Sequence, residues 1–341
     1  ENRPHILEQT PEALSRWFTE HEEPSYRLDQ LLGWIYERYA VSFEEMTNLS
    51  KGLRERLARD YSFAMPSERD HTRSRDGSTE KYLLELEDGA QIECVAMGEP
   101  GRYAFCISSQ VGCQLGCEFC ATGEHGYVRD LSTSEILAQI LHLARPRGQL
   151  GNIVFMGMGE PLLNTEAVLP ALSALSDEDR FALGSRRITL STAGVTPGIR
   201  ELAWNEARPR LALSLNSPFN EQRSKLMPIN REHPLEEVLE ACHDYREVTG
   251  RPLTIEYVAL GQVNTSDEHA HALADIAREL EAHVNLIEFN PVGGSPFAPP
   301  GREEIQRFRH LLESAGVSVT QRYKRGRDIS AACGQLAAQG Q

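Results

Sequence analysis

Apolar residues recur at steps of three and four positions over about the first 65 residues, and no strand pattern interrupts them. This spacing is typical of helices with one buried face. The members of three successive runs are Leu14, Trp17 and Phe18, then Leu28, Leu31, Leu32 and Ile35, and then Leu53 and Leu57. A Thr-Pro-Glu sequence at residues 10–12 is a start signal for the first run. We therefore expect residues 1–75 to form a small helical domain.

The pattern changes to alternation between Tyr82 and Ala96, where two short runs surround the dipeptide Asp88-Gly89. Alternation of apolar and polar residues is typical of half-buried strands. An Asp-Gly pair between two such runs suits a type I′ hairpin turn. Residues 76–98 are therefore predicted to form a β-hairpin that links the helical domain to the remainder of the chain, residues 99–341.

From Ala104 onward, short apolar segments rich in β-branched residues alternate with helical stretches. The expected strands are Phe105–Ser108, Ile153–Met156, Ile188–Ser191, Leu211–Leu215, Leu253–Val258, Val284–Phe289 and Val317–Thr320. Ser132 and Glu135 have the spacing of a capping box at the start of one helix, and another helix is expected to stop at Gly316. Such alternation predicts an α/β class fold with parallel strands in a partial or complete barrel, whose reacting groups lie at the carboxyl ends of the strands.

Charge and hydropathy narrow the classes of partner. The 341 residues include 35 Lys and Arg against 50 Asp and Glu, a formal net charge of −15. This balance argues against broad attraction to nucleic acid or anionic membrane, although local basic groups occur at Arg73, Arg75, Arg186-Arg187 and residues 323–327. No apolar run approaches the ~20 residues of a membrane span, and the first residues show no signal-peptide pattern. A cytoplasmic protein without a membrane partner is expected.

The strongest chemical signal is a Cys-x3-Cys-x2-Cys loop, Cys113, Cys117 and Cys120, directly after the first expected barrel strand. Three thiolates at this spacing can hold three irons of a [4Fe–4S] cluster and leave the fourth iron open to a substrate. A structural zinc site is the alternative, but it closes with four ligands, and His125 is the only nearby candidate for the fourth.

This cysteine spacing is that of the radical S-adenosylmethionine (radical SAM) enzymes, and further motifs narrow the resemblance. The stretches concerned are residues 106–113, Gly157 to Pro161, Leu190 to Thr192, Met227 to Asn230, Ala331 to Leu336 and, near the N-terminus, Glu45 to Ser50. Together they resemble the RlmN/Cfr family of RNA adenine methyltransferases, from about Glu93 to Leu336. The resemblance implies a partial (β/α)6 radical SAM barrel preceded by a helical domain that binds RNA.

The resemblance also implies cofactors and catalytic residues. A [4Fe–4S] cluster would be held by Cys113, Cys117 and Cys120, and two S-adenosylmethionine molecules would be used per turnover. Cys333 would be methylated by the first, and hydrogen would be removed from that methyl group with the second. Cys106 would resolve the resulting protein–RNA adduct by forming a disulfide, and Glu93 would act as a proton acceptor.

Residues at strand ends match the family positions that contact S-adenosylmethionine. They are Gly159, Glu160, Ser191, Ser214, Leu215, Asn216 and Asn290. One of them departs from the family pattern, because the usual Ser-Leu-His triplet is Ser-Leu-Asn here, ending at Asn216. Asparagine can form a hydrogen bond but cannot carry a proton, so a titrating role at this position is not expected.

The implied substrate is RNA, with an electron donor such as flavodoxin and no DNA partner. RlmN-type members methylate C2 of an adenine in the peptidyl-transferase centre of 23S rRNA and of an adenine beside the anticodon of some tRNAs. Cfr-type members methylate C8 of the same rRNA adenine and give antibiotic resistance. The N-terminal stretch favours the C2 reaction, whereas residues 218–227 resemble Cfr as much. A non-enzymatic iron–sulfur or zinc RNA-binding protein and a radical enzyme acting on a small molecule remain alternatives.

Overall fold

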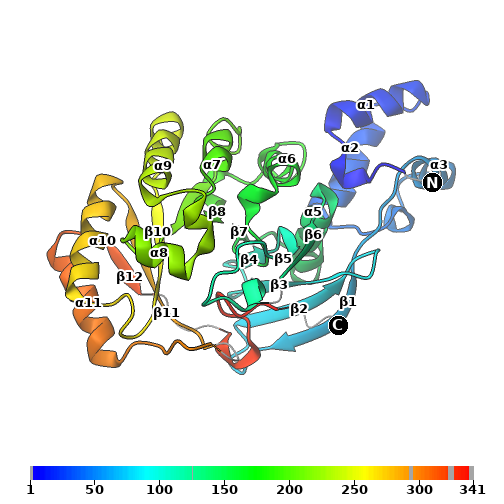
Figure 1. Ribbon diagram of the computed structural model, residues 1–341. Helices are drawn as coiled ribbons and strands as arrows, with labels where there is room; N and C mark the ends of the chain where they lie inside the picture. Colours follow the sequence, from blue (N-terminus) through cyan, green and yellow to red (C-terminus); the bar gives the residue numbers. More distant parts are fainter. Residues whose placement is uncertain (1–2, 125, 292–294, 322–325, 338–341) are drawn as a thin grey trace.

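The computed structural model describes residues 3–124, 126–291, 295–321 and 326–337. A ten-stranded sheet forms its centre, with helices against its outer face (Figure 1). The strands are β1 (Ser67–Arg73), β2 (Thr79–Glu85), β3 (Gln91–Met97), β4 (Ala104–Ile107), β5 (Gln110–Gly112), β6 (Tyr127–Asp130), β7 (Asn152–Phe155), β8 (Ile188–Thr192), β9 (Arg210–Ser214), β10 (Thr254–Ala259), β11 (His283–Glu288) and β12 (Val319–Gln321). The helices are α1 (Pro11–Glu20), α2 (Tyr26–Leu32), α3 (Lys51–Asp60), α4 (Ala121–Glu124), α5 (Thr133–Ala144), α6 (Thr165–Ser176), α7 (Thr196–Leu202), α8 (Asn220–Leu226), α9 (Leu235–Thr249), α10 (Asp267–Glu279) and α11 (Arg302–Ser314).

The order of strands in the large sheet is β1-β2-β3-β4-β7-β8-β9-β10-β11-β12, while β5 and β6 form a small separate pair. Within the large sheet, β4 and β7 to β12 pair in parallel, and β1 to β3 extend the sheet with antiparallel pairing. In the described part of the chain the sheet ends at β1 and β12, so the barrel is partial. This confirms the predicted fold class, and each of the seven expected strands overlaps an observed one.

The capping box predicted at the start of α5 is present. The Glu135 main-chain N–H donates to Ser132 Oγ at 3.2 Å, and the Ser132 N–H donates to the Glu135 carboxylate at 2.9 Å. The carboxylate of Glu8 accepts from the main-chain N–H and the hydroxyl of Ser134 at 3.1 and 2.7 Å. The N-terminal segment is therefore fastened to the first turn of a barrel helix.

The expected N-terminal helices are observed as α1, α2 with a continuing turn at Gly33–Glu37, and α3. Their apolar faces join the core of the barrel in one continuous cluster, in which Ile6 and Leu7 are fully buried. An ion pair between Arg145 and Glu45, at 2.9 Å, adds a polar contact across the same junction. None of the helices in the described residues is long and apolar enough to cross a membrane.

The hairpin of β2 and β3 is present, but its predicted type I′ turn is wrong. Leu86 accepts from the Gly89 N–H at 3.0 Å and donates to the Ala90 carbonyl at 2.8 Å, and Gly89 alone has a positive φ, 86°. This is the pattern of a type I turn followed by a left-handed glycine. A type I′ turn would also require a positive φ at Asp88, a conformation that is uncommon for residues other than glycine.

Strand β1 was not predicted, because its sequence, Ser-Glu-Arg-Asp-His-Thr-Arg, contains no apolar alternation. It is mostly exposed and is fixed by antiparallel pairing with β2. The hairpin is therefore a three-stranded antiparallel unit, and its first strand lies within the range expected to be helical.

Phe308→Ala tests the packing of α11 on the sheet. Phe308 is fully buried and stacks on Tyr257 of β10, with ring centroids 5.6 Å apart. Loss of a buried aromatic ring leaves a cavity, and we expect the free energy of unfolding to fall by about 3–5 kcal/mol in urea titrations. Phe308→Leu, which retains much of the volume, is expected to cost less. A loss below about 1 kcal/mol for the alanine variant would contradict this packing.

Candidate functional site

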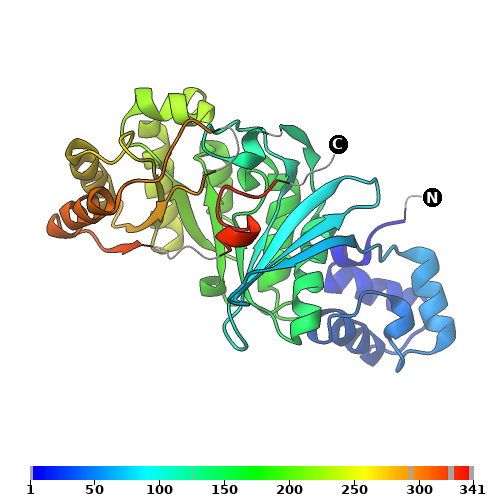
Figure 2. The same ribbon diagram turned by 90° about the horizontal axis from the view of Figure 1, so that it is seen from below.

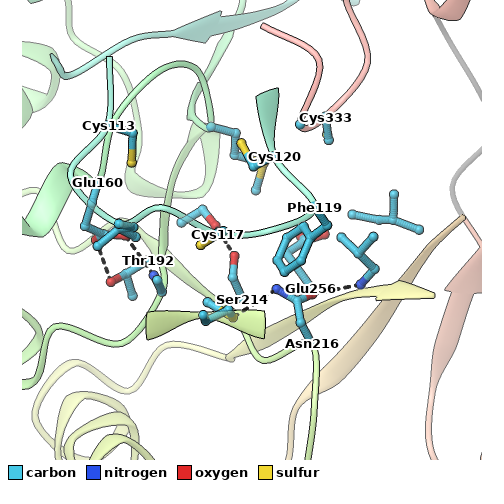
Figure 3. Close-up of a pocket in the computed structure, with 18 of the residues that line it drawn as sticks. Cys113, Cys117, Phe119, Cys120, Glu160, Thr192, Ser214, Asn216, Glu256 and Cys333 are labelled. Carbon is cyan, nitrogen blue, oxygen red and sulfur yellow. Dashed lines mark hydrogen bonds between the residues drawn. The ribbon is translucent and has the colours of Figure 1, made fainter. Parts of the chain in front are cut away.

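Cys113, Cys117 and Cys120 line one cavity at the carboxyl ends of the parallel strands (Figure 3). Their loop leaves the sheet through β5, where Gly112 has a φ of 79°. A Cβ at Gly112 would lie 2.0 Å from the carbonyl oxygen of Gly126, and the next residue, Cys113, donates its N–H to that same oxygen at 2.9 Å. Glycine is therefore needed for the close approach of β6 that sets the direction of the cysteine loop.

The cysteine loop rests on a small apolar cluster separate from the main core. The members of this cluster are Leu115, Phe119, Ala193, Leu226, Met227, Ile229, Leu260 and Phe289, and all three cysteines pack against it. Burial raises the pKa of the Cys113 thiol to about 12 and that of Cys117 well above its usual range. Thiolates at this site are therefore favoured only when bound cations compensate their charge.

In the described part of the chain, no three His, Cys, Asp or Glu side chains converge closely enough to hold a single metal ion. A [4Fe–4S] cluster does not require such convergence, because each thiolate binds a different iron. His125, the candidate fourth zinc ligand, lies outside the described residues.

Glu160 forms one polar wall of the cavity, directly after the turn that follows β7. Its buried carboxylate accepts from Thr192 Oγ1 at 2.7 Å, from the Ala193 N–H at 2.8 Å and from the Leu162 N–H at 3.2 Å. Burial raises the Glu160 pKa to about 6, and these hydrogen bonds oppose the rise without cancelling it. The preceding Gly159 has a φ of 99°, and a Cβ there would lie 2.6 Å from the Cβ of Gln110.

The ends of β8 and β9 supply Ser191 and Ser214, whose hydroxyl oxygens are 3.2 Å apart. Asn216 follows with a φ of 57°, a left-handed conformation that asparagine tolerates better than most residues. Its Oδ1 accepts from the Val258 N–H at 2.9 Å, and its Nδ2 faces the sulfur of Met227 at 3.3 Å. Asn216 thus joins the ends of β9 and β10 while lining the cavity.

Leu215 differs from the other residues expected to contact S-adenosylmethionine. Its side chain is fully buried in the main core and does not line the cavity, because successive residues at a strand end point to opposite faces. Asn290 does line the cavity, where its Oδ1 is buried and accepts no hydrogen bond from the described residues. A buried acceptor of this kind fits a ligand that donates a hydrogen bond to it.

Sequence reasoning missed two charged residues of this region. Glu256 of β10 is 5% exposed, lines the cavity and accepts from Asn285 Nδ2 at 2.9 Å. Its charge within an apolar strand was a signal that could have identified it. Arg223 of α8 is fully buried, and burial lowers its pKa to about 10. Its guanidinium donates to main-chain carbonyls at the ends of β8 and β9, a role that the sequence does not reveal.

Cys333 lies on a C-terminal loop that crosses from the hairpin to the cysteine loop (Figure 2). The Ala121 N–H donates to the Gly334 carbonyl at 2.8 Å, and Thr122 Oγ1 donates to the Leu336 carbonyl at 2.6 Å. Cys333 lines the cavity of the three cysteines and also an adjacent, mostly apolar one that contains Cys106 of β4. The structure therefore brings all five predicted cysteines to two adjoining cavities.

Glu93 lines neither of these two cavities. It lies on β3, and its side chain is 6% exposed. Its carboxylate pairs with Lys81 Nζ at 2.9 Å and accepts the Ala337 N–H at 2.8 Å, four residues beyond Cys333. Glu93 thus contacts the C-terminal loop.

The basic residues noted in the sequence do not form one surface. Arg73 and Arg75 are exposed near the turn between β1 and β2, and the Arg75 N–H donates to Asp328 in the C-terminal loop. Arg186 and Arg187 precede β8, at the edge of the sheet opposite the cavities. Residues 323–325 lie outside the described residues.

Comparisons with known proteins agree with this arrangement. The family described as Radical SAM superfamily matches residues 107–276, and the ribosomal RNA large subunit methyltransferase N-terminal domain matches residues 5–62. The crystal structure of a radical SAM methyltransferase from Sphaerobacter thermophilus covers 98% of this chain and all of its own, with a TM-score of 0.93 and 42% identity. Fold and site thus define the class of radical SAM proteins.

Curated relatives specify the family. The probable dual-specificity RNA methyltransferase RlmN of Dictyoglomus thermophilum is 44% identical over 93% of this chain and 91% of its own length. The dual-specificity RNA methyltransferase RlmN of Alkalilimnicola ehrlichii is 43% identical over 97% of this chain and 93% of its own length. The chain belongs to the RlmN family of radical SAM RNA methyltransferases. Membership implies a [4Fe–4S] cluster and S-adenosylmethionine, which the three partly buried loop cysteines and the polar wall of the cavity fit.

The environment of Glu160 predicts an elevated carboxyl pKa that infrared spectroscopy can measure. A protonated-carboxyl band, assigned by its loss in Glu160→Gln, should disappear as the pH rises through about 6 in the cofactor-free protein. Because the folded-state pKa lies above the ordinary value of 4.5, this group contributes most to stability below that pH. The contribution declines as the pH rises from 4.5 to about 6. Disappearance of the band near the ordinary value of 4.5 would contradict the assignment.

Proposed function

We propose that this protein methylates C2 of an adenine in 23S rRNA, at the peptidyl-transferase centre, and C2 of an adenine beside the anticodon of tRNA. The main support is the position of Cys333, which lines both the cavity of the three loop cysteines and the cavity of Cys106. A residue that accepts a methyl group at one cofactor and carries it to a base needs access to both sides. The names of the RlmN relatives support RNA as the substrate.

Cys113, Cys117 and Cys120 would hold the [4Fe–4S] cluster, which when reduced supplies the electron for reductive cleavage of S-adenosylmethionine. Around the same cavity, Glu160 would accept from the ammonium group of S-adenosylmethionine. Further contacts would come from Gly159, Ser191, Ser214, Asn216 and Asn290, with Leu215 contributing main-chain atoms alone. The apolar cluster beneath the loop excludes water, which strengthens each of these polar contacts.

Cys333 would act first as a nucleophile towards the methyl group of one S-adenosylmethionine, so that a sulfur–carbon bond forms as the sulfonium bond breaks. A second S-adenosylmethionine is consumed to remove one hydrogen atom from this methyl group. The methyl carbon then bonds to C2 of the adenine. The electron that the adduct gives up would return to the cluster held by Cys113, Cys117 and Cys120, and the ring proton would go to Glu93, its proposed acceptor. The Cys106 thiolate then attacks the Cys333 sulfur and a disulfide forms. The bond between that sulfur and the methylene carbon breaks, and the carbon keeps the electron pair and takes up a proton, which releases the methylated base.

The N-terminal helices are the proposed contact for folded RNA, because they match the N-terminal domain of ribosomal RNA methyltransferases. A low-potential one-electron donor such as flavodoxin would reduce the cluster. With ribosomal and transfer RNA as substrates, the activity belongs in the cytoplasm, and neither DNA nor a membrane has a part in it.

Anaerobic turnover tests the proposed reaction. The reconstituted protein is incubated with S-adenosylmethionine, reductant and unmodified 23S rRNA fragments or tRNA, and nucleosides are analysed by mass spectrometry. We expect 2-methyladenosine from the wild type, at least a hundredfold less from Cys333→Ala, and a protein–RNA adduct from Cys106→Ala because no thiol resolves it. Cys242→Ala, at a buried cysteine outside both cavities, is the matched control and should retain activity. Formation of 8-methyladenosine alone would move the assignment to the Cfr-type reaction, and activity without Cys333 would refute the mechanism.

Gly112→Ala tests the geometry that directs the cysteine loop. The added Cβ meets the Gly126 carbonyl oxygen at 2.0 Å, so β6 and Cys113 must shift. We expect iron and sulfide content after anaerobic reconstitution to fall to less than about half of the wild-type value. Gly116→Ala is the control within the same loop, because its Cβ would meet nothing within 4 Å although its φ is also positive, 58°. Equal loading of the two variants would contradict the role given to Gly112.

A further inference from the structure

The ion pair between Lys81 and Glu93 is unusually well buried. The two side chains are 16% and 6% exposed, whereas those of Lys51 and Lys225, which also form ion pairs, are 83% and 68% exposed. Burial of a charged pair costs desolvation energy, and each remaining polar contact of the pair must be satisfied. The pair therefore needs further partners, and the structure shows where they are.

The sheet register explains why the two side chains meet. Lys81 of β2 lies opposite Val95 of β3, and Glu93 is two residues from Val95 along the same strand. Residues at this diagonal position share a face of the sheet, and long side chains can reach across the gap. Val95 in turn lies opposite Cys106 of β4, so the pair and Cys106 lie on one face.

Both members of the pair hold the C-terminal loop, one on each side of Cys333. Lys81 Nζ donates to the Ser330 carbonyl at 3.3 Å, three residues before Cys333. Glu93 accepts the Ala337 N–H at 2.8 Å, four residues after it. Ser330 itself has a φ of 51°, a conformation that serine adopts only when its surroundings impose it. The contacts therefore fix the loop at two points around Cys333.

We propose that Lys81 is a positioning residue, which together with Glu93 clamps the C-terminal loop so that Cys333 lies between the two cavities. This inference rests on the proposed function for the role of Cys333, but the clamp itself is a property of the loop and can be measured without RNA. Glu93 then has two separable tasks, to accept the Ala337 N–H and to accept the ring proton.

Hydrogen–deuterium exchange of the full-length, anaerobically reconstituted protein measures the clamp. Lys81→Met removes the donor to Ser330 and leaves the Glu93 carboxylate without its cation, and we expect amides of residues 330–337 to exchange about fivefold faster or more. Lys81→Arg retains a cation and should restore most of the protection. Lys225→Met removes a lysine from an exposed pair on α8 and should change nothing in this segment.

A second variant removes the clamp contact without touching the buried charges. Ala337→Pro lacks the N–H that Glu93 accepts, and position 337 lies outside the helices and strands of the barrel. We expect the same faster exchange of residues 330–336. If exchange in this segment is unchanged in both Lys81→Met and Ala337→Pro, the clamp is refuted.

Methylation of Cys333, read from the mass of its peptide, connects the clamp to the reaction. Lys81→Met should lower the methylated fraction and Lys81→Arg should recover it. Glu93→Gln keeps an oxygen that accepts the Ala337 N–H, so it should preserve loop protection while it reduces RNA methylation. Faster exchange in Lys81→Met without any RNA methylation by the wild type would support the clamp and refute the proposed function. Normal RNA methylation by the wild type with unchanged exchange in Lys81→Met would support the proposed function and refute the clamp.

Discussion

The hydrogen bond from the Ala121 N–H to the Gly334 carbonyl, 2.8 Å long, joins two loops that are far apart in the sequence. It places the residue after Cys120 against the residue after Cys333. The remainder of the site depends on this contact, because the first cavity is closed by the cysteine loop on one side and by the Cys333 loop on the other. The partial barrel supplies the floor of this cavity, and the Cys333 loop is also held by Lys81 of β2 and Glu93 of β3.

Burial shifts the pKa values of the ionisable groups in and around the first cavity. Two of the loop thiols, Cys113 and Cys117, and the Glu160 carboxyl all have raised pKa values because water is excluded, whereas the buried Arg223 has a lowered one. A site of this kind disfavours isolated charges and favours a ligand that completes their pairing. The polar groups are held by main-chain contacts at the ends of β8, β9 and β10, so they are already oriented before a ligand arrives.

Much of the fold could be predicted because its signals are local. The capping box at Ser132, the apolar strand segments and the left-handed glycine near Asp88 act through neighbours in the sequence, although the exact turn type was wrong since only Gly89 takes a positive φ. Strand β1 was not predicted because its residues are polar and it has no buried face, so no apolar alternation marks it before it pairs with β2.

The site, like the fold, could be predicted only in part. Cysteine spacing and the motifs around Gly159 and Cys333 identify the loops. Because the reacting groups of such a barrel lie at the carboxyl ends of its parallel strands, these loops are expected at that edge of the sheet. The side chain of Leu215 lies in the main core, which the matching triplet could not reveal, because a motif does not tell which of its side chains faces the cavity. Arg223 and Lys81 were missed because their roles come from main-chain carbonyls that approach only in the folded chain.

The central claim is that the methyl carbon passes through Cys333 on its way to the base. It is tested most directly by turnover with S-adenosylmethionine whose methyl group carries three deuterium atoms, followed by mass spectrometry of the methylated adenosine and of the 5′-deoxyadenosine released. Passage through Cys333 predicts a product methyl group with two deuterium atoms, the third appearing in 5′-deoxyadenosine. A product that retains all three deuterium atoms would show direct transfer and contradict the account.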